Sequence, residues 1–226
     1  KAGVHINAMV KNQVSYEHMD PSLLGNKRRM LLSELSGKTS IVEAAKELNH
    51  TIDKKSEQAR RLHDIILERE RQGYHFEAAE ASFKLIIERE LKQHKGFFET
   101  LGFRAIIMKR DSGDMISEAM IKIRVGDQIQ HTVAEGDGPV NALDTALRKA
   151  LIGFYPELAT MHLSDFKVRV LDEKEGTAAK VRVLIESQDA DDVWTTIGVS
   201  ENIIEASWNA LVDSIEYKLL KARRGH

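Results

Sequence analysis

Cysteine is missing from this 226-residue chain, and its absence excludes disulfide bonds, thiolate metal sites and a cysteine nucleophile. A chain without cysteine is compatible with a reducing compartment, and we expect a cytoplasmic protein. Long apolar stretches are missing as well, because no run reaches the ~18 residues that a membrane-spanning helix requires. No signal peptide is visible, so the sequence predicts no membrane partner.

An excess of charge of one sign is also lacking. Lys and Arg number 33 and Asp and Glu number 35, which leaves a formal net charge of -2. Such a balance produces no global field to attract nucleic acid or an anionic membrane. Residues 218–226 are basic, but the helix dipole favours cations at the carboxyl end of a helix. We therefore predict no nucleic-acid partner.

The usual signatures of catalysis and metal binding are absent too. The nine histidines form neither a His-x-His nor a His-Glu-x-x-His pattern, and no Gly-x-Ser-x-Gly motif occurs. Neighbouring carboxylates such as Glu68 and Glu70, or Asp191 and Asp192, are typical of a solvated surface. We predict no metal site and no cofactor in this chain, which favours a binding and assembly module.

The composition, 42% hydrophobic and 30% charged, is that of a soluble globular protein with one large or two modest domains. Residues 1–35 contain too few apolar side chains for a core of their own and should pack on another part of the protein. Because the chain starts at Lys1 and not at Met, we expect that an amino-terminal part precedes it.

Residues 36–96 show helical periodicity. Ser40 and Glu43 have the spacing of a capping box, in which the serine begins a helix that should run through Leu48. Two more amphipathic helices are indicated by apolar residues at i, i+3 and i+4 around positions 59–66 and 78–86. Gly73 and Gly96 are the expected breaks, so this part is predicted to be a small helical subdomain.

The period changes to alternation in residues 97–226. Strands are predicted at 103–109, 119–125 and 128–133, followed by a helix at 139–151. The same order returns with strands at 166–171, 179–185 and 193–197 and a helix at about 201–220. The sequence therefore predicts an α+β fold, in which a helical linker region precedes a regulatory or dimerisation domain of two βββα units.

The two units align when the sequence is shifted by 64 positions. This shift places Thr132 on Thr196, Ala142 on Ala206 and Ala146 on Ala210. Two copies are too few for a solenoid, so the repeat indicates a domain with two-fold pseudo-symmetry. We expect each unit to leave apolar surface for a second copy of the chain, and hence a homodimer.

The turn before each helix is the candidate binding site. Gly136-Asp137-Gly138 resembles a phosphate-binding loop only weakly, because the later glycine of a dinucleotide fingerprint and the Gly-Lys-Ser/Thr of a P-loop are missing. In the second interpretation the glycines permit positive φ and Pro139 starts the helix, so the turn only shapes the fold. In the third, free amides receive the carboxylate of an amino-acid effector. The candidate effector-binding residues are Gly136, Asp137, Gly138, Pro139, Val140, Gly198, Val199, Ser200 and Asn202.

Three stretches give the chain a family resemblance. They are Lys1-Ala-Gly-Val-His5 together with residues 15–41, which include Tyr16-Glu-His-Met-Asp-Pro21, then residues 135–142, and finally residues 196–206. Together they resemble the carboxyl-terminal half of the citramalate synthase branch of the isopropylmalate synthase family. Members of this family join an acetyl-CoA-dependent (β/α)8 barrel to a helical linker region and a regulatory domain of paired βββα units.

The resemblance implies that the barrel, absent from this chain, holds the divalent metal and the catalytic groups, so that this chain alone is inactive. The intact protein would condense acetyl-CoA with pyruvate to (R)-citramalate and would be inhibited by isoleucine. The alternatives are the same region of a leucine-regulated 2-isopropylmalate synthase and a free-standing amino-acid-binding dimerisation module. Tyr16 matches a family tyrosine that assists the active site of the partner subunit, and His5 is a weaker candidate for such a role.

Overall fold

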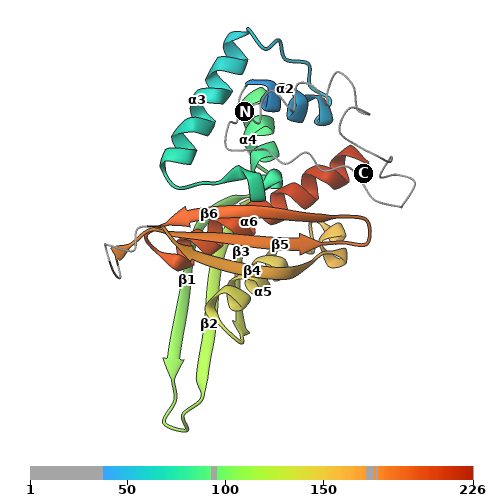
Figure 1. Cartoon of the computed structure of the whole chain (residues 1–226). Helices are drawn as coiled ribbons and strands as arrows, with labels where there is room; N and C mark the ends of the chain where they lie inside the picture. The colour runs from blue at the N-terminus through green and yellow to red at the C-terminus, as the bar shows by residue number, and fades with distance from the viewer. Residues whose placement is uncertain (1–37, 93–95, 172–175, 177, 226) are drawn as a thin grey trace, which may run out of the picture.

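The structure is a computed structural model that describes residues 38–92, 96–171, 176 and 178–225. His5, Tyr16 and the expected subdomain 1–35 lie outside the described residues. The described part consists of a helical segment followed by two βββα units. In Figure 1 the helical segment lies on one side of the second sheet and the first unit lies on the other. The α+β fold expected from the sequence is confirmed.

The helical segment contains α2 (Lys38–Glu47), α3 (Glu57–Arg71), the short 3-10 helix η3 (Phe76–Ala78) and α4 (Glu80–Lys92). Ser56 caps α3, because its side chain accepts a hydrogen bond from the amide of Ala59. The break at Gly73 is confirmed, with a φ of 106° that favours glycine. The three helices surround one apolar cluster, whose largest fully buried members are Ile41, Leu62, Ile66, Phe76, Phe83, Leu85 and Ile87.

The expected capping box is wrong. α2 already begins at Lys38, so Ser40 lies inside the helix, where it is buried, and does not cap it. Glu43 makes an ion pair with Lys46 at 2.9 Å on the surface of the same helix. The serine-to-glutamate spacing also occurs within helices, and here burial of Ser40 beside Ile41 replaces the expected capping role.

The first unit contains β1 (Glu99–Lys109), β2 (Met115–Val125), β3 (Gln128–Gly136) and α5 (Pro139–Leu151). The strands form an antiparallel sheet in the order β1-β2-β3. Alternate residues of β2, including Ala119, Ile121 and Ile123, are buried beneath α5. The β1–β2 hairpin projects beyond the rest of the molecule (Figure 1).

The second unit follows the 3-10 helix η4 (Pro156–Thr160) and contains β4 (His162–Val170), β5 (Val181–Gln188), β6 (Val193–Ser200) and α6 (Ile203–Arg224). Its sheet has the order β4-β5-β6, and its buried residues Val183 and Ile185 share one core with those of the first unit. Phe103 of β1 stacks on Trp208 of α6 with ring centroids 4.8 Å apart, which joins the two units.

The outer faces of the two sheets differ. Ile197 on the second sheet is only 1% exposed because it packs into the cluster of the helical segment. On the first sheet, the outward side chains of Ile106, Met108, Ile129 and Val133 are 38–51% exposed. The repeat is therefore symmetric in its strands and helices but not in its surroundings.

Candidate functional site

The first candidate site is the turn at residues 136–140, between β3 and α5. Gly138 is the residue that precedes the first turn of α5, and no side chain caps the helix there. Pro139 occupies the first helical position, as the sequence predicted. Helix starts without a side-chain cap present backbone amides that favour an anionic group such as a carboxylate. Asn141 braces the turn, because its Oδ1 accepts a hydrogen bond of 3.2 Å from the amide of Asp137.

The glycines of this turn are not needed for positive φ, and that part of the prediction is wrong. Gly138 is extended, with a φ of -161°, and the position of a Cβ on it is surrounded by open space. Gly136 is needed for another reason, since a Cβ there would lie 2.5 Å from the amide nitrogen of Ala142. Gly136 therefore lets the strand pass close to the helix, whereas a side chain at Gly138 would point into free space.

The second candidate site, at residues 198–202, has a different construction. Gly198 and Val199 belong to β6, and a Cβ on Gly198 would lie 1.9 Å from the carbonyl oxygen of Ala206. Asn202 caps α6, because its Oδ1 accepts hydrogen bonds from the amides of Ile204 at 2.8 Å and Glu205 at 3.4 Å. A carboxylate at this turn would have to displace the cap.

Ser200 of the second turn is also engaged within the protein. The hydroxyl of Ser200 donates a 2.5 Å hydrogen bond to Oε2 of Glu205 and accepts one of 3.0 Å from the amide of Asn202. The two turns are thus alike in their place in the repeat but not in their chemistry. The first presents an open helix start, and the second presents a closed ring of side-chain and backbone hydrogen bonds.

A polar network that the sequence analysis did not identify joins α4 to the second unit. Ser82 and Arg89 of α4 both donate hydrogen bonds of 2.8 Å to the carboxylate of Asp213 in α6. The amide of Phe97 donates a 2.8 Å hydrogen bond to Glu216, one turn further along α6. Their separation in sequence exceeds 100 residues, so no local pattern indicates these contacts.

Glu88 of α4 and Glu216 of α6 are deeply buried acidic residues. Burial raises the pKa of Glu216, although the backbone hydrogen bond from Phe97 and the charge of Arg89 oppose that rise. Glu88 accepts hydrogen bonds from Arg224 at 2.6 Å and from His50 at 2.8 Å. Glu88 holds the end of α6 against the helical segment, and Glu216 joins α6 to the amide of Phe97.

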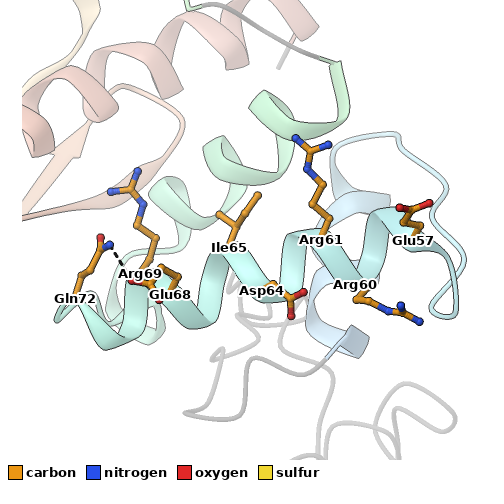
Figure 2. A pocket seen from close by; sticks show the side chains of 8 residues that line it. All are labelled: Glu57, Arg60, Arg61, Asp64, Ile65, Glu68, Arg69 and Gln72. Atoms are coloured by element: carbon orange, nitrogen blue, oxygen red, sulfur yellow. Dashed lines mark hydrogen bonds between the residues drawn. The ribbon is translucent and has the colours of Figure 1, made fainter.

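A hollow of about 680 Å³ lies along α3 (Figure 2). It is lined by Glu57, Arg60, Arg61, Asp64, Ile65, Glu68, Arg69 and Gln72. Charges of both signs line it, and Gln72 donates a hydrogen bond of 3.2 Å to Glu68 within the lining. No residue of either turn takes part, so this hollow is separate from the candidate effector sites.

Among the described residues, no group of three or more His, Asp or Glu side chains is placed to hold a metal ion. Within the same part of the chain, every helix is too short or too polar to cross a membrane.

Comparison with known proteins places this architecture in a family. Residues 77–219 match the LeuA allosteric (dimerisation) domain, and residues 1–69 match the homocitrate synthase post-HMGL domain-like family. The first match covers α4, the first βββα unit and the second unit as far as residue 219 in α6. The chain belongs to the family of the LeuA allosteric (dimerisation) domain.

The similar curated proteins are named (R)-citramalate synthase. The chain is 51% identical to the protein of Geobacter sulfurreducens and 50% identical to that of Aquifex aeolicus, in each case over 98% of its length. It is 43% identical to the protein of Synechocystis sp. over 97% of its length. The chain spans 41–42% of the length of these relatives. It corresponds to their carboxyl-terminal regulatory region.

Proposed function

We propose that this chain is the linker and allosteric regulatory part of an acyltransferase that condenses acetyl-CoA with pyruvate to (R)-citramalate, with isoleucine as feedback inhibitor. The observation that carries the proposal is the similarity of the whole chain to proteins named (R)-citramalate synthase. In this proposal residues 1–35 and 36–96 form the linker and 97–226 the regulatory domain. The catalytic barrel with its divalent metal lies outside this chain, and Tyr16 and His5 assist it.

The first turn is the more open of the two proposed effector sites. Isoleucine needs donors for its carboxylate, an acceptor for its ammonium group and an apolar surface for its side chain. The uncapped start of α5 supplies amide donors, the exposed carboxylate of Asp137 supplies an acceptor, and half-buried Val140 supplies an apolar contact. At the second turn, Glu201 and the apolar Ile203 and Ile204 offer similar chemistry once the Asn202 cap is displaced.

Calorimetry on the 226-residue chain tests the effector. We expect isoleucine to bind with measurable heat and leucine and valine to bind more weakly. Gly138→Val should abolish binding, because it fills the open space at the turn without straining the extended backbone. Gly102→Val is the matched control, since Gly102 of β1 is also surrounded by open space. Preference for leucine would favour a 2-isopropylmalate synthase, and absence of heat with all three would refute the effector site.

A homodimer is the proposed assembly. The β1–β2 hairpin leaves Ile107 and Met115 on the core-facing side 52% and 62% exposed, and β4 leaves Phe166, Val168 and Val170 37–51% exposed on the same side of its sheet. Such apolar surface favours a self-complementary interface. Sedimentation of the chain at micromolar concentration should give a dimer. Met115→Glu should shift it toward monomer, while Lys122→Glu on an exposed polar position should not.

The activity of the intact enzyme supplies a separate test. We expect the longer protein to use pyruvate in preference to 2-ketoisovalerate, and this chain alone to release no CoA from acetyl-CoA. A preference for 2-ketoisovalerate would assign the protein to the isopropylmalate branch. Turnover by the 226-residue chain itself would contradict the proposal that the barrel catalyses the reaction and this chain regulates it.

A further inference from the structure

Ser82 of α4 contacts both β6 and α6, the strand and the helix on either side of the second turn. Ser82 of α4 is 1% exposed, and its hydroxyl donates a hydrogen bond of 2.8 Å to Oδ2 of Asp213 in α6. The hydroxyl oxygen of Ser82 also accepts a hydrogen bond of 3.1 Å from the amide of Ile197 in β6. A change in the spacing of β6 and α6 would therefore break or displace a bond to α4.

Asp213 has a second partner on α4. Its Oδ1 accepts a 2.8 Å hydrogen bond from Nη2 of Arg89, and its side chain is only 16% exposed. Removing one member of a buried polar network leaves the others unsatisfied, so such a network favours one relative arrangement of its elements. Here the network specifies how α4, β6 and α6 sit together.

The first unit has no such arrangement at the corresponding positions. The 64-residue shift places Val133 on Ile197 and Lys149 on Asp213. Val133 is 38% exposed whereas Ile197 is 1% exposed, and exposed Lys149 donates a 3.3 Å hydrogen bond to the carbonyl of Val133 itself. The edge between β3 and α5 therefore faces solvent in the first unit, whereas Ser82 of α4 covers the corresponding edge between β6 and α6 in the second.

α6 contacts α4 from its middle to its carboxyl end. The helix begins at Ile203, directly after its cap Asn202 in the second turn, and runs for 22 residues to Arg224. Arg224 donates a hydrogen bond of 2.6 Å to Glu88 of α4. Consecutive residues of an α-helix are held by internal hydrogen bonds, so a shift at its start displaces the residues that follow. α4 thus contacts α6 both in the middle, through Ser82, and at the end, through Glu88.

We propose that Ser82 is a positioning residue through which the second turn, and not the first, controls the arrangement of the helical segment. An effector that displaces the Asn202 cap would move the start of α6, and the Ser82–Asp213 bond would pass that movement to α4. The regulatory meaning of this coupling rests on the proposed function. The coupling itself is a property of the described residues and needs no ligand to be measured.

Hydrogen exchange of the 226-residue chain without ligand tests the coupling. Asn202→Ala removes the cap of α6, and we expect amides of α4 to exchange about fivefold faster, because loss of a cap weakens the helix that α4 is bonded to. In the Ser82→Ala background the same substitution should accelerate exchange at the start of α6 but leave α4 unchanged. Asn141→Ala, which removes the brace of the first turn, is the matched control and should not affect α4.

Three results would overturn the proposal. They are an α4 that does not respond to Asn202→Ala, an equal response to Asn141→Ala, and a response that persists without the Ser82 hydroxyl. If Ser82→Ala fails to fold, Asp213→Ala removes the acceptor of the same bond and should also prevent the response. Because no amino acid is added, failure of isoleucine to bind would refute the effector site without changing the outcome of this experiment.

Discussion

The hydroxyl of Thr196 in β6 donates a hydrogen bond of 2.8 Å to the backbone carbonyl of Ala210 in α6. The same bond occurs 64 residues earlier, where Thr132 donates to the carbonyl of Ala146 at 2.9 Å. A strand and the helix that follows it are thus connected in the same way in both units. The internal repeat seen in the sequence is a structural repeat at the level of individual hydrogen bonds.

Replacing each threonine by valine separates the bond from the packing. Thr196 is fully buried, so we expect Thr196→Val to lower the free energy of unfolding by about 1 kcal/mol. Thr132→Val should lower it less, because Thr132 is only partly buried and water can replace the lost donor. Urea unfolding of the two variants measures the difference. An unchanged stability for Thr196→Val would show that the bond does not hold β6 to α6.

Glycine is required at one turn position and dispensable at another. Gly198→Ala should destabilise the protein by about 3 kcal/mol, because the new Cβ would overlap the carbonyl oxygen of Ala206. Gly138→Ala should be neutral or slightly stabilising, since its Cβ enters open space and φ is extended there. Thermal or urea unfolding compares the two. Equal stability of both variants would contradict the close approach of β6 and α6.

Adjacent arginines at the end of α6 should differ in importance. Arg224 donates a 2.6 Å hydrogen bond to the fully buried carboxylate of Glu88, so Arg224→Met should cost about 3 kcal/mol. Arg223 is 47% exposed and lies 3.8 Å from Glu88, so Arg223→Met should cost about 1 kcal/mol or less. Adding Glu88→Gln to Arg224→Met should recover part of the loss. A double variant as unstable as the sum of the single ones would argue against the pair.

Asp189, in the hairpin between β5 and β6, should make the free energy of unfolding depend on pH. Burial alone would raise the pKa of Asp189, but hydrogen bonds from Lys218 and backbone amides, together with the charge of Lys221, hold that pKa well below its ordinary value. A depressed folded pKa contributes stability above the unfolded value of about 3.9, and this contribution is lost as pH falls below it.

Asp189→Asn should therefore be less stable than the parent chain at pH 7, and the difference should shrink as the pH is lowered below about 4. Urea unfolding at pH 7, 4 and 3 measures it. Asp127→Asn, at an exposed turn, is the control. A difference between Asp189→Asn and the parent chain that does not change with pH would mean that the carboxylate does not titrate differently on folding.

Local patterns were sufficient for the order of elements. The helix expected at 139–151 is α5 with the same bounds, because Pro139 and the apolar spacing act within the segment itself. Boundaries were less accurate where neighbouring structure decides them, as at Ser40, which lies inside α2. The 3-10 helices η3 and η4 were not predicted, since their short turns leave no clear period in the sequence.

For the candidate turns, too, the sequence predicted one part and only the structure showed the other. Their positions before two related helices follow from the sequence repeat, and the resemblance of the chain to its family was visible in residues 15–41, 135–142 and 196–206. The difference between them was not visible, because it depends on the side chain of Asn202 folding back onto α6 and on the absence of such a cap at Gly138.

The sequence by itself determined the α+β class, the two βββα units and the pseudo-symmetry between them, because periodicity and turn residues act over a few positions. Only the tertiary structure decided which unit is joined to the helical segment. Ser82 and Asp213 are 131 residues apart, and their hydrogen bond forms because packing of Ile197 and Leu220 into the helical core brings α4 against β6 and α6. Contacts of that range depend on how the faces of whole elements are buried, and no local spacing specifies them.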